Sequence, residues 1–217
     1  MAPERLANFG SQTLLQRLDV QLLAVDEAHC VSQWGHDFRP DYLKIGALRQ
    51  QLGGVQTIAL TATADEDTRA EIISKLFDKK PNVFIGGFDR PNLSLAFEPK
   101  NQPRKQVLEF VAARKGQPGI IYCASRNKCE QLAIALEKGG HQAQYYHAGM
   151  LPEDRRAAEA RFKTADGLVM CATIAFGMGV DKPDIRFVIH ADLPKSVEAY
   201  YQEVGRAGRD GAPADTL

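Results

Sequence analysis

An Asp-Glu-Ala-His sequence, residues 26–29, directly follows the short apolar run Leu22–Val25. Ligand chemistry in open α/β sheets takes place at the carboxyl ends of strands. At such a position Asp26 can hold Mg²⁺, and the adjacent Glu27 can polarise a water for attack on a phosphate. Two acids after a strand are also common as a solvated start of a loop, so the pair alone leaves both interpretations open.

The loop that follows is rich in aromatic and cationic side chains. It contains the only tryptophan of the chain, Trp34, together with His36, Phe38, Arg39 and Tyr42. Unstacked bases of nucleic acids lie against aromatic rings and guanidinium groups, at about 1–3 kcal/mol per base. Glycine and charged residues interrupt the stretch and leave no apolar period for a core element. The composition therefore favours a surface for single-stranded nucleic acid over a buried element.

Two arginines near the C-terminus, Arg206 and Arg209, each follow a glycine. Glycines allow a close approach of the backbone and leave the guanidinium groups free to reach across a cleft. An arginine that stabilises the charge on a transferring phosphoryl group raises the rate by about 10³–10⁵-fold, which corresponds to roughly 4–7 kcal/mol. Without further motifs, two arginines among glycines indicate a solvated turn.

The elements that must position these residues alternate between short apolar runs and amphipathic stretches, which is typical of βα units and a parallel sheet. The pattern predicts strands at 20–25, 57–60, 119–123, 143–147, 168–171 and 186–190. It predicts helices at 41–51, 65–77 and 126–138, one beginning at Pro152, and a last one capped by Ser196. A stretch at 86–92 with Gly and Pro reads as a linker. We therefore expect an α/β fold in two parts, residues 1–87 and 88–217.

Composition excludes several classes of protein. The 217 residues carry 27 basic and 27 acidic side chains, so neither a strongly basic coat protein nor an acidic disordered tail fits. A neutral protein can still bind nucleic acid through a local basic and aromatic surface. The four cysteines form no C-x-x-C pair, which argues against a zinc site. The sequence shows no membrane span and no signal peptide, so we expect a cytoplasmic protein.

Taken in order along the chain, these motifs resemble those of RecQ-family DNA helicases, which belong to helicase superfamily 2. Residues 25–42 resemble motif II and the aromatic-rich loop of that family. Later segments resemble motif III, motif IV and the segment after it, motif V and motif VI, at 59–64, 120–126, 146–149, 172–183 and 200–211. The resemblance covers essentially the whole chain and implies RecA-like parallel sheets flanked by helices. Residues 1–87 would be the C-terminal part of a first lobe, and 88–217 a nearly complete second lobe.

The resemblance also implies a role for each matching residue, with ATP and Mg²⁺ as cofactors. It implies that ATP hydrolysis depends on Asp26, Glu27, His29, Arg206 and Arg209, with Asp26 and Glu27 at the Mg²⁺. Nucleotide contacts are implied for Gly179, Asp181 and Gln202, and coupling to strand movement for Thr61 and Thr63. DNA contacts are implied for Gln33, Trp34, His36, Phe38, Arg39, Ser125, Arg126, His147 and Thr173. Ser125 suits a helix cap equally well. Thr61, Thr63 and His147 also suit polar ends of strands.

The sequence departs from the family at one point that matters for activity. It contains no Gly-Lys dipeptide and hence no G-x-x-x-x-G-K-[ST] phosphate loop. We therefore expect a partial helicase core that begins inside the first lobe and ends before the zinc-binding and winged-helix regions of the family. Such a fragment is expected to be inactive alone.

The leading interpretation is an ATP-dependent 3′–5′ DNA helicase that acts in recombination, repair and replication. Its expected partners are single-stranded DNA and DNA forks or duplexes, and we expect a monomer with no membrane partner. The expected location is the cytoplasm near the nucleoid, or the nucleus of a eukaryote. The alternative is a non-catalytic nucleic-acid-binding or interaction module with the same fold.

Overall fold

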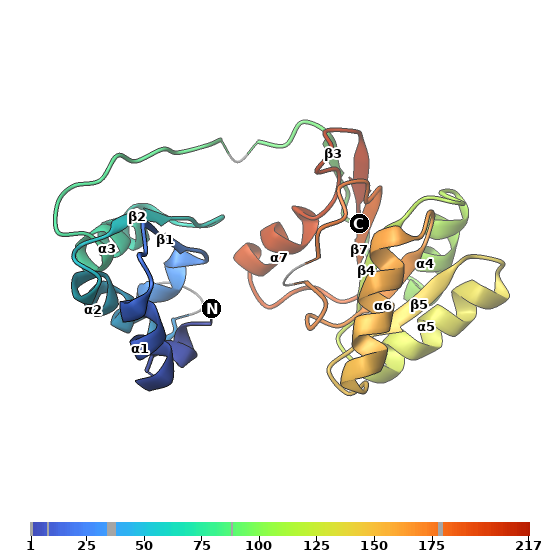
Figure 1. Ribbon diagram of the computed structural model, residues 1–217. Coiled ribbons are helices and arrows are strands. Elements are labelled where there is room, and N and C mark those ends of the chain that lie inside the picture. The colour runs from blue at the N-terminus through green and yellow to red at the C-terminus, as the bar shows by residue number, and fades with distance from the viewer. Residues whose placement is uncertain (1, 8, 34–37, 88, 178–179) are drawn as a thin grey trace. The chain divides into compact units, whose positions relative to one another are not determined.

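The computed structural model describes residues 2–7, 9–33, 38–87, 89–177 and 180–217. The chain forms two compact units, residues 1–87 and 88–217 (Figure 1). All strand pairs in both units are parallel. Among the described residues, no helix is both long enough and apolar enough to cross a membrane.

The first unit is built on two parallel strands, β1 (Leu22–Val25) and β2 (Gln56–Ala59). Its helices are α1 (Phe9–Arg17), α2 (Leu43–Gln51) and α3 (Glu66–Leu76). Short 3₁₀ helices span Pro3–Ala7, Ala28–Val31 and Pro40–Tyr42. The core of its described part is one hydrophobic cluster, which joins β1 and the 28–31 turn to α2 and α3.

Local signals explain where the helices of this unit begin. Asp65 caps α3, because its Oδ1 accepts a hydrogen bond from the backbone N–H of Thr68 at 2.8 Å. Glu66 and Asp67 then place negative charge at the positive end of the helix dipole. The predicted start of α2 at residue 41 is two residues early, because the Pro40–Tyr42 turn precedes the helix.

The second unit contains a six-stranded sheet in the order β3-β8-β7-β4-β6-β5. The strands are β3 (Leu93–Leu95), β4 (Gly119–Tyr122), β5 (Ala143–Tyr146), β6 (Val169–Ala172), β7 (Phe187–His190) and β8 (Ala214–Thr216). The helices are α4 (Pro103–Ala112), α5 (Arg126–Lys138), α6 (Pro152–Thr164) and α7 (Val197–Val204). Because β4 pairs in parallel with β6 and with β7, the sheet brings the carboxyl ends of these distant strands to one edge.

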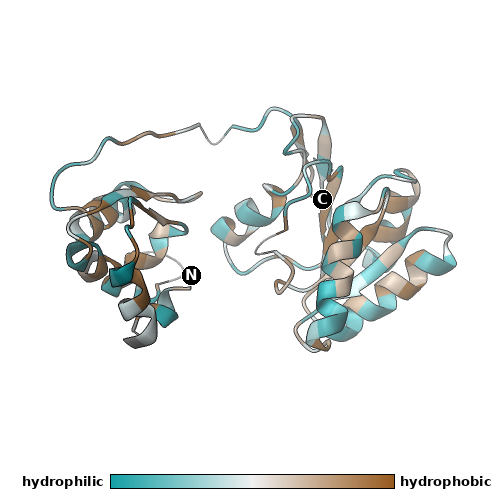
Figure 2. Cartoon of the chain, in the orientation of Figure 1, coloured by the Kyte–Doolittle hydropathy of each residue, from teal (hydrophilic) through white to brown (hydrophobic). Residues whose placement is uncertain are grey.

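Both faces of the central strands are buried. Ile120 and Met170 pack in one hydrophobic cluster with Phe162 of α6, whereas Ile121 packs in a second cluster with Leu132 of α5. A strand that is covered on both faces reads as a continuous apolar run rather than an alternating one. Figure 2 shows hydrophilic and hydrophobic residues together on α5 and α6, as expected for helices with one buried side.

The predicted set of strands is incomplete. The structure adds β3 and β8, which pair with each other, and β8 also pairs with β7. Each of the two added strands has only three residues, Leu-Ser-Leu and Ala-Asp-Thr, and so lacks the apolar run that marks a buried strand. Helices α1, at 9–17, and α4, at 103–112, were also absent from the predicted elements.

Candidate functional site

The first group of candidate residues lies at the carboxyl end of β1. Asp26 and Glu27 are both exposed. Glu27 adopts a left-handed conformation, with φ 50° and ψ 43°, which is strained for a residue with a side chain. The N–H of Glu27 donates to Asp26 Oδ1 at 2.9 Å, and the N–H of Ala28 donates to the Leu60 carbonyl at 2.9 Å. These bonds hold the strained turn and keep both carboxylates at the end of the strand.

This pair of acids fits a hard divalent cation. Mg²⁺ binds proteins through one or two carboxylates and keeps several of its waters, which suits two adjacent exposed carboxylates. One of the two, Asp26, is oriented by its hydrogen bond with Glu27. Within the described ranges, no three His, Cys, Asp or Glu side chains come together in a way that could hold a metal ion.

A buried histidine connects the acids to the end of β2. His29 is 2% exposed, and its Nδ1 lies 2.9 Å from Thr61 Oγ1 and 3.4 Å from Glu27 Oε2. Thr61 Oγ1 donates to the Thr63 carbonyl at 3.1 Å, so the compatible tautomer of His29 carries its proton on Nδ1. The structure thus brings together Glu27, His29, Thr61 and Thr63, which the sequence analysis proposed separately. The side chain of Thr63 has a buried Oγ1 without a hydrogen-bond partner among the described residues.

The start of the aromatic loop is fixed to α3 by a residue that the sequence analysis missed, Glu71. Its Oε2 accepts hydrogen bonds from Ser32 Oγ at 2.6 Å and from the N–H of Gln33 at 2.9 Å. Lys75 Nζ lies 3.0 Å from Glu71 Oε1. The hydrogen bonds from Ser32 and then Lys75 hold the pKa of Glu71 below its ordinary value of 4.5. No local pattern identifies Glu71, because its loop partners lie 38 and 39 residues away.

Of the five loop residues predicted to contact DNA, the structure describes three. Gln33 is exposed, and Phe38 and Arg39 are half-buried. Trp34 and His36 lie outside the described residues. The loop closes through the N–H of Arg39, which donates to the Cys30 carbonyl at 2.9 Å.

Glu71 makes the stability of the first unit depend on pH. Since folding lowers its pKa, its contribution is fully present above pH 4.5 and is lost as the pH falls through the lower folded value. Glu71→Gln is therefore expected to lower the urea midpoint at pH 7, and the two proteins should converge in acid. Fluorescence of Trp34, the only tryptophan, would follow this unfolding. Equal midpoints at pH 7 would contradict the expected role of Glu71, and exposed Glu4→Gln on the same unit is the control.

In the second unit, the turn after α7 carries Arg206 and Arg209. Arg206 Nη1 donates to the Gly177 carbonyl, and a Cβ on Gly177 would lie 2.7 Å from Arg206 Nη2. The glycine therefore makes room for the guanidinium group. Arg209 Nη1 donates to the Val180 carbonyl at 3.3 Å and lies 3.7 Å from Asp181 Oδ1. Both arginines thus contact the segment that follows β6.

Of the residues predicted to contact the nucleotide, Asp181 belongs to this group, and its side chain is 87% exposed. Gln202 lies on α7 and is half-buried. Gly179 lies outside the described residues. The exposed position of Asp181 beside Arg209 suits contact with a polar ligand.

A buried pair fixes α7 to the sheet. His190 Nε2 at the end of β7 lies 2.6 Å from Glu203 Oε2, and the two side chains are 3% and 10% exposed. The ring of Tyr122 stacks on His190 with centroids 5.5 Å apart, and its hydroxyl donates to the Phe176 carbonyl at 3.2 Å. Burial raises the pKa of Tyr122 to about 12, so its hydroxyl stays protonated. His190 and Glu203 are not among the residues predicted from the sequence, because their partnership depends on the fold.

Three predicted DNA contacts lie at the carboxyl ends of the neighbouring strands β4 and β6. Ser125 caps α5, since its Oγ accepts from the N–H of Lys128 at 3.3 Å, which confirms the helix-cap alternative. Arg126 is exposed and lies against Gly149, where a Cβ would be 2.7 Å from its Nη1. Thr173, half-buried, follows β6 directly. Their DNA contacts stay predictions.

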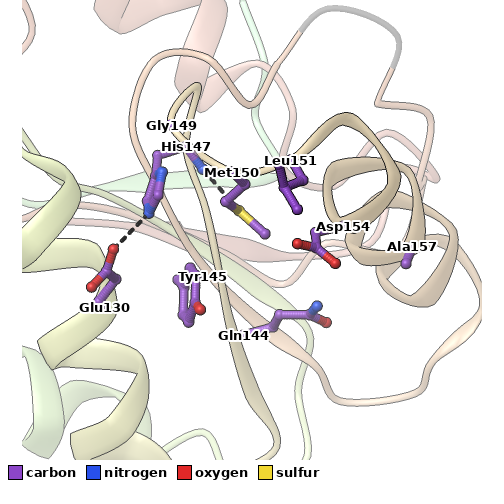
Figure 3. Close-up of a pocket in the computed structure, with 9 residues that line it drawn as sticks. All are labelled: Glu130, Gln144, Tyr145, His147, Gly149, Met150, Leu151, Asp154 and Ala157. Carbon is purple, nitrogen blue, oxygen red and sulfur yellow. Dashed lines mark hydrogen bonds and ion pairs between the residues drawn. The ribbon is translucent and has the colours of Figure 1, made fainter.

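His147, at the end of β5, is 5% exposed. Its Nε2 lies 2.9 Å from Glu130 Oε1, and its ring stacks on Tyr145 with centroids 5.6 Å apart. Figure 3 shows the ring turned toward Glu130 in the wall of a cleft of about 550 Å³, which also includes Asp154 and Met150. A buried ring paired with a carboxylate suits the polar strand end that the sequence analysis left open. The DNA contact of His147 stays a prediction.

The four cysteines, Cys30, Cys123, Cys129 and Cys171, are all free and buried. Burial raises the pKa of the Cys171 thiol well above its ordinary value of 9.0. A thiol with a raised pKa is a poor nucleophile at neutral pH. The buried thiols therefore fill space in the two hydrophobic cores.

Two helicase domain families match the chain. The DEAD/DEAH box helicase family matches residues 1–72, and the helicase conserved C-terminal domain matches residues 102–211. The chain is 46% identical over 217 residues to the ATP-dependent DNA helicase RecQ of Pasteurella multocida (strain Pm70), covering 100% of this chain and 34% of that protein. It is 48% identical over 211 residues to the RecQ-like DNA helicase BLM of Xenopus laevis, covering 95% of this chain and 15% of that protein. It thus spans about a third of the length of the bacterial relative.

Among solved structures, the chain is similar to the DEAD-box helicase Mss116 bound to ssRNA and UDP-BeF. The TM-score is 0.77 at 19% sequence identity, and the match covers 99% of this chain and 46% of that chain. At this identity the similarity shows the fold alone. It confirms the predicted α/β class, with parallel sheets flanked by helices as in RecA-like helicase lobes.

Proposed function

Because this chain belongs to the helicase conserved C-terminal domain family and is a RecQ-family sequence, we propose that it is part of the core of an ATP-dependent 3′–5′ DNA helicase. In this proposal, residues 1–87 belong to the first RecA-like lobe and residues 88–217 form the second. The substrates are ATP and DNA, as single strands, forks or duplexes, in recombination, repair and replication. The protein acts as a monomer inside the cell, at the nucleoid or in a nucleus.

One contact in the structure gives this proposal its main support. His29 Nδ1 lies between Glu27 Oε2 and Thr61 Oγ1, and so connects an acid after β1 to a hydroxyl after β2. A carboxylate that orients the attacking water must respond to the state of the DNA, and the buried His29 ring, bonded to Thr61 and close to Glu27, is a direct way to transmit that state. Thr61 and Thr63 would then report the movement of the strand to Glu27.

In this proposal, Asp26 and Glu27 act at the phosphates of ATP. Asp26 and Glu27 would hold Mg²⁺, which supplies charge neutralisation of the phosphates when it is bound. Glu27 would accept the hydrogen bond of the attacking water through a carboxylate oxygen. Its strained backbone fixes the direction of this carboxylate, which is a known way to preorganise an active site.

In this proposal, Arg206 and Arg209 stabilise the negative charge that develops on the phosphoryl group during its transfer. Arg209 is the better candidate for the arginine finger, since its side chain is 40% exposed and its contacts to Val180 and Asp181 are long. Arg206 is held by the Gly177 carbonyl and would lie near the γ-phosphate. Asp181, Gly179 and Gln202 would contact the nucleotide.

The DNA contacts come from two places in the chain. Loop residues Gln33, Trp34, His36, Phe38 and Arg39 would stack on or contact single-stranded bases. The strand-end residues Ser125, Arg126, His147 and Thr173 would contact the sugar-phosphate backbone. Such backbone contacts position the strand without reading its sequence.

The 217-residue polypeptide alone is expected to hydrolyse no ATP above background. Its sequence contains no phosphate loop, whose N–H groups would cradle the β-phosphate and whose lysine would offset the phosphate charge. The test measures ATP turnover of the purified chain with and without single-stranded DNA. It also measures a hybrid in which these residues replace the matching segment of the Pasteurella multocida protein. We expect the chain to be silent and the hybrid to show DNA-stimulated turnover that Glu27→Gln abolishes.

Two other outcomes of this test would change the proposal. DNA-stimulated turnover by the isolated chain would contradict its inactivity. A hybrid that folds and binds ATP but does not hydrolyse it would favour the second candidate, a non-catalytic nucleic-acid-binding or interaction module. The observation in favour of that candidate is the absence of a Gly-Lys dipeptide from the sequence.

A further inference from the structure

Arg90 is hydrogen-bonded to the arginine turn, which we define as residues 206–209. Its Nη2 donates to the carbonyl of Ala207 at 3.0 Å and to the carbonyl of Gly208 at 2.9 Å. A planar guanidinium group suits this contact, because its fixed donors can satisfy two neighbouring carbonyls at once. The bonded residues are 117 and 118 positions apart, so local sequence gives no sign of the contact.

Asn92 holds the same turn from a second direction. Its Nδ2 donates to the Gly208 carbonyl at 2.9 Å and to the Ala212 carbonyl at 3.0 Å. Arg90 Nε donates to Asn92 Oδ1 at 3.4 Å, which orients the amide so that its N–H groups face the turn. The backbone carbonyl of Asn92 accepts from the N–H of Ala214 at 2.9 Å, which continues into the pairing of β3 with β8.

The turn is fitted closely around the Asn92 amide. Gly208 has φ +55°, and a Cβ at this position would lie 2.5 Å from Asn92 Nδ2 and 2.8 Å from the Ala212 carbonyl oxygen. Only glycine satisfies both the left-handed backbone and this close approach. Gly208 therefore leaves room for a specific partner, the Asn92 amide. A glycine at this position was expected only to allow a close approach of the backbone.

We propose that Arg90 and Asn92 are positioning residues for Arg206 and Arg209. Two of the carbonyls that they hold belong to Ala207 and Gly208, the residues between the arginines. The peptide plane of the Gly208 carbonyl ends at the Cα of Arg209, and the Ala207 carbonyl lies one residue after Arg206. The bonds therefore fix the backbone of the turn from which both side chains project. The inference rests on the proposed function, in which the two arginines act on phosphate. It adds two residues of the segment first read as a linker to the residues on which hydrolysis depends.

The test uses Asn92→Asp in the 217-residue chain. The substitution keeps the size of the side chain, removes both donated hydrogen bonds and points an oxygen at two carbonyls. We expect the NMR side-chain Nε–Hε resonances of Arg206 and Arg209 to shift or broaden, while the backbone resonances of β4, β6 and β7 stay unchanged. The matched control is Asn101→Asp, an exposed asparagine of the same unit, which should move neither set.

The opposite result is equally clear. A folded Asn92→Asp variant with unchanged Arg206 and Arg209 resonances would overturn the proposal, even if its melting temperature were lower, because the role would then be structural. If Asn92→Asp does not fold, the same measurement uses Arg90→Lys. Lysine keeps the positive charge but lacks the planar N–H donors of arginine. Unchanged arginine resonances in that variant would overturn the proposal in the same way. These measurements need no nucleotide, so they stay separate from a failure of the proposed ATP hydrolysis.

Discussion

Arg209→Ala in the Pasteurella multocida hybrid is expected to lower the rate of DNA-stimulated ATP turnover by about 10³–10⁵-fold. The Arg209 side chain is 40% exposed and makes only long contacts, at 3.3 Å to the Val180 carbonyl and 3.7 Å to Asp181. Such a side chain can leave these contacts for the developing charge on a phosphoryl group at little cost. Arg209→Lys should restore only a small part of the rate, because lysine lacks the planar fork that matches phosphate oxygens.

The measurement is steady-state ATP turnover at saturating single-stranded DNA, with ATP affinity measured separately. The loss should fall on kcat, since an arginine finger acts mainly on the transition state. Arg104→Ala is the matched control, because Arg104 is exposed on α4 of the same unit. A loss of less than about tenfold in Arg209→Ala would assign the finger elsewhere, with Arg206 as the next residue to test.

Limited proteolysis of the purified chain is expected to remove the first unit and leave residues from about 88 to 217 intact. The second unit has a six-stranded sheet with hydrophobic clusters on both faces. The described part of the first unit has a two-stranded sheet and one hydrophobic cluster. A two-stranded sheet buries little apolar surface, and a unit of this kind opens at low free energy.

The first cut is expected in the segment that joins the units. Phe84 is 92% exposed and Ile85 is 64% exposed, in a stretch without regular structure. Chymotrypsin should cleave at Phe84, and mass spectrometry of a time course should identify the fragment that persists. Phe84→Ser should slow this first cut without changing the final fragment. Persistence of an N-terminal fragment in place of the C-terminal one would show that the stability of the two units is reversed.

Elements with strong local signals were predicted closely from the sequence. Helix α5 has the predicted bounds, because Ser125 caps its start and Gly139 and Gly140 follow its end. The helix predicted at 65–77 is α3 (Glu66–Leu76), whose start is capped by Asp65. Strand β8, by contrast, has three residues and forms only because β3 and β7 lie beside it.

In the candidate site, too, some features could be predicted from the sequence and others could not. The family resemblance, the acids after β1 and the arginine pair after α7 could be predicted from the amino-acid sequence, because residue type and spacing are local properties of the chain. Which of these residues meet could be seen only in the folded protein. Thr61 lies 32 residues from His29, Glu71 lies 39 residues from Ser32, and Gly208 lies 118 residues from Arg90. Contacts over such separations depend on how parallel strands and their crossover helices stack, and no short stretch of sequence specifies that order.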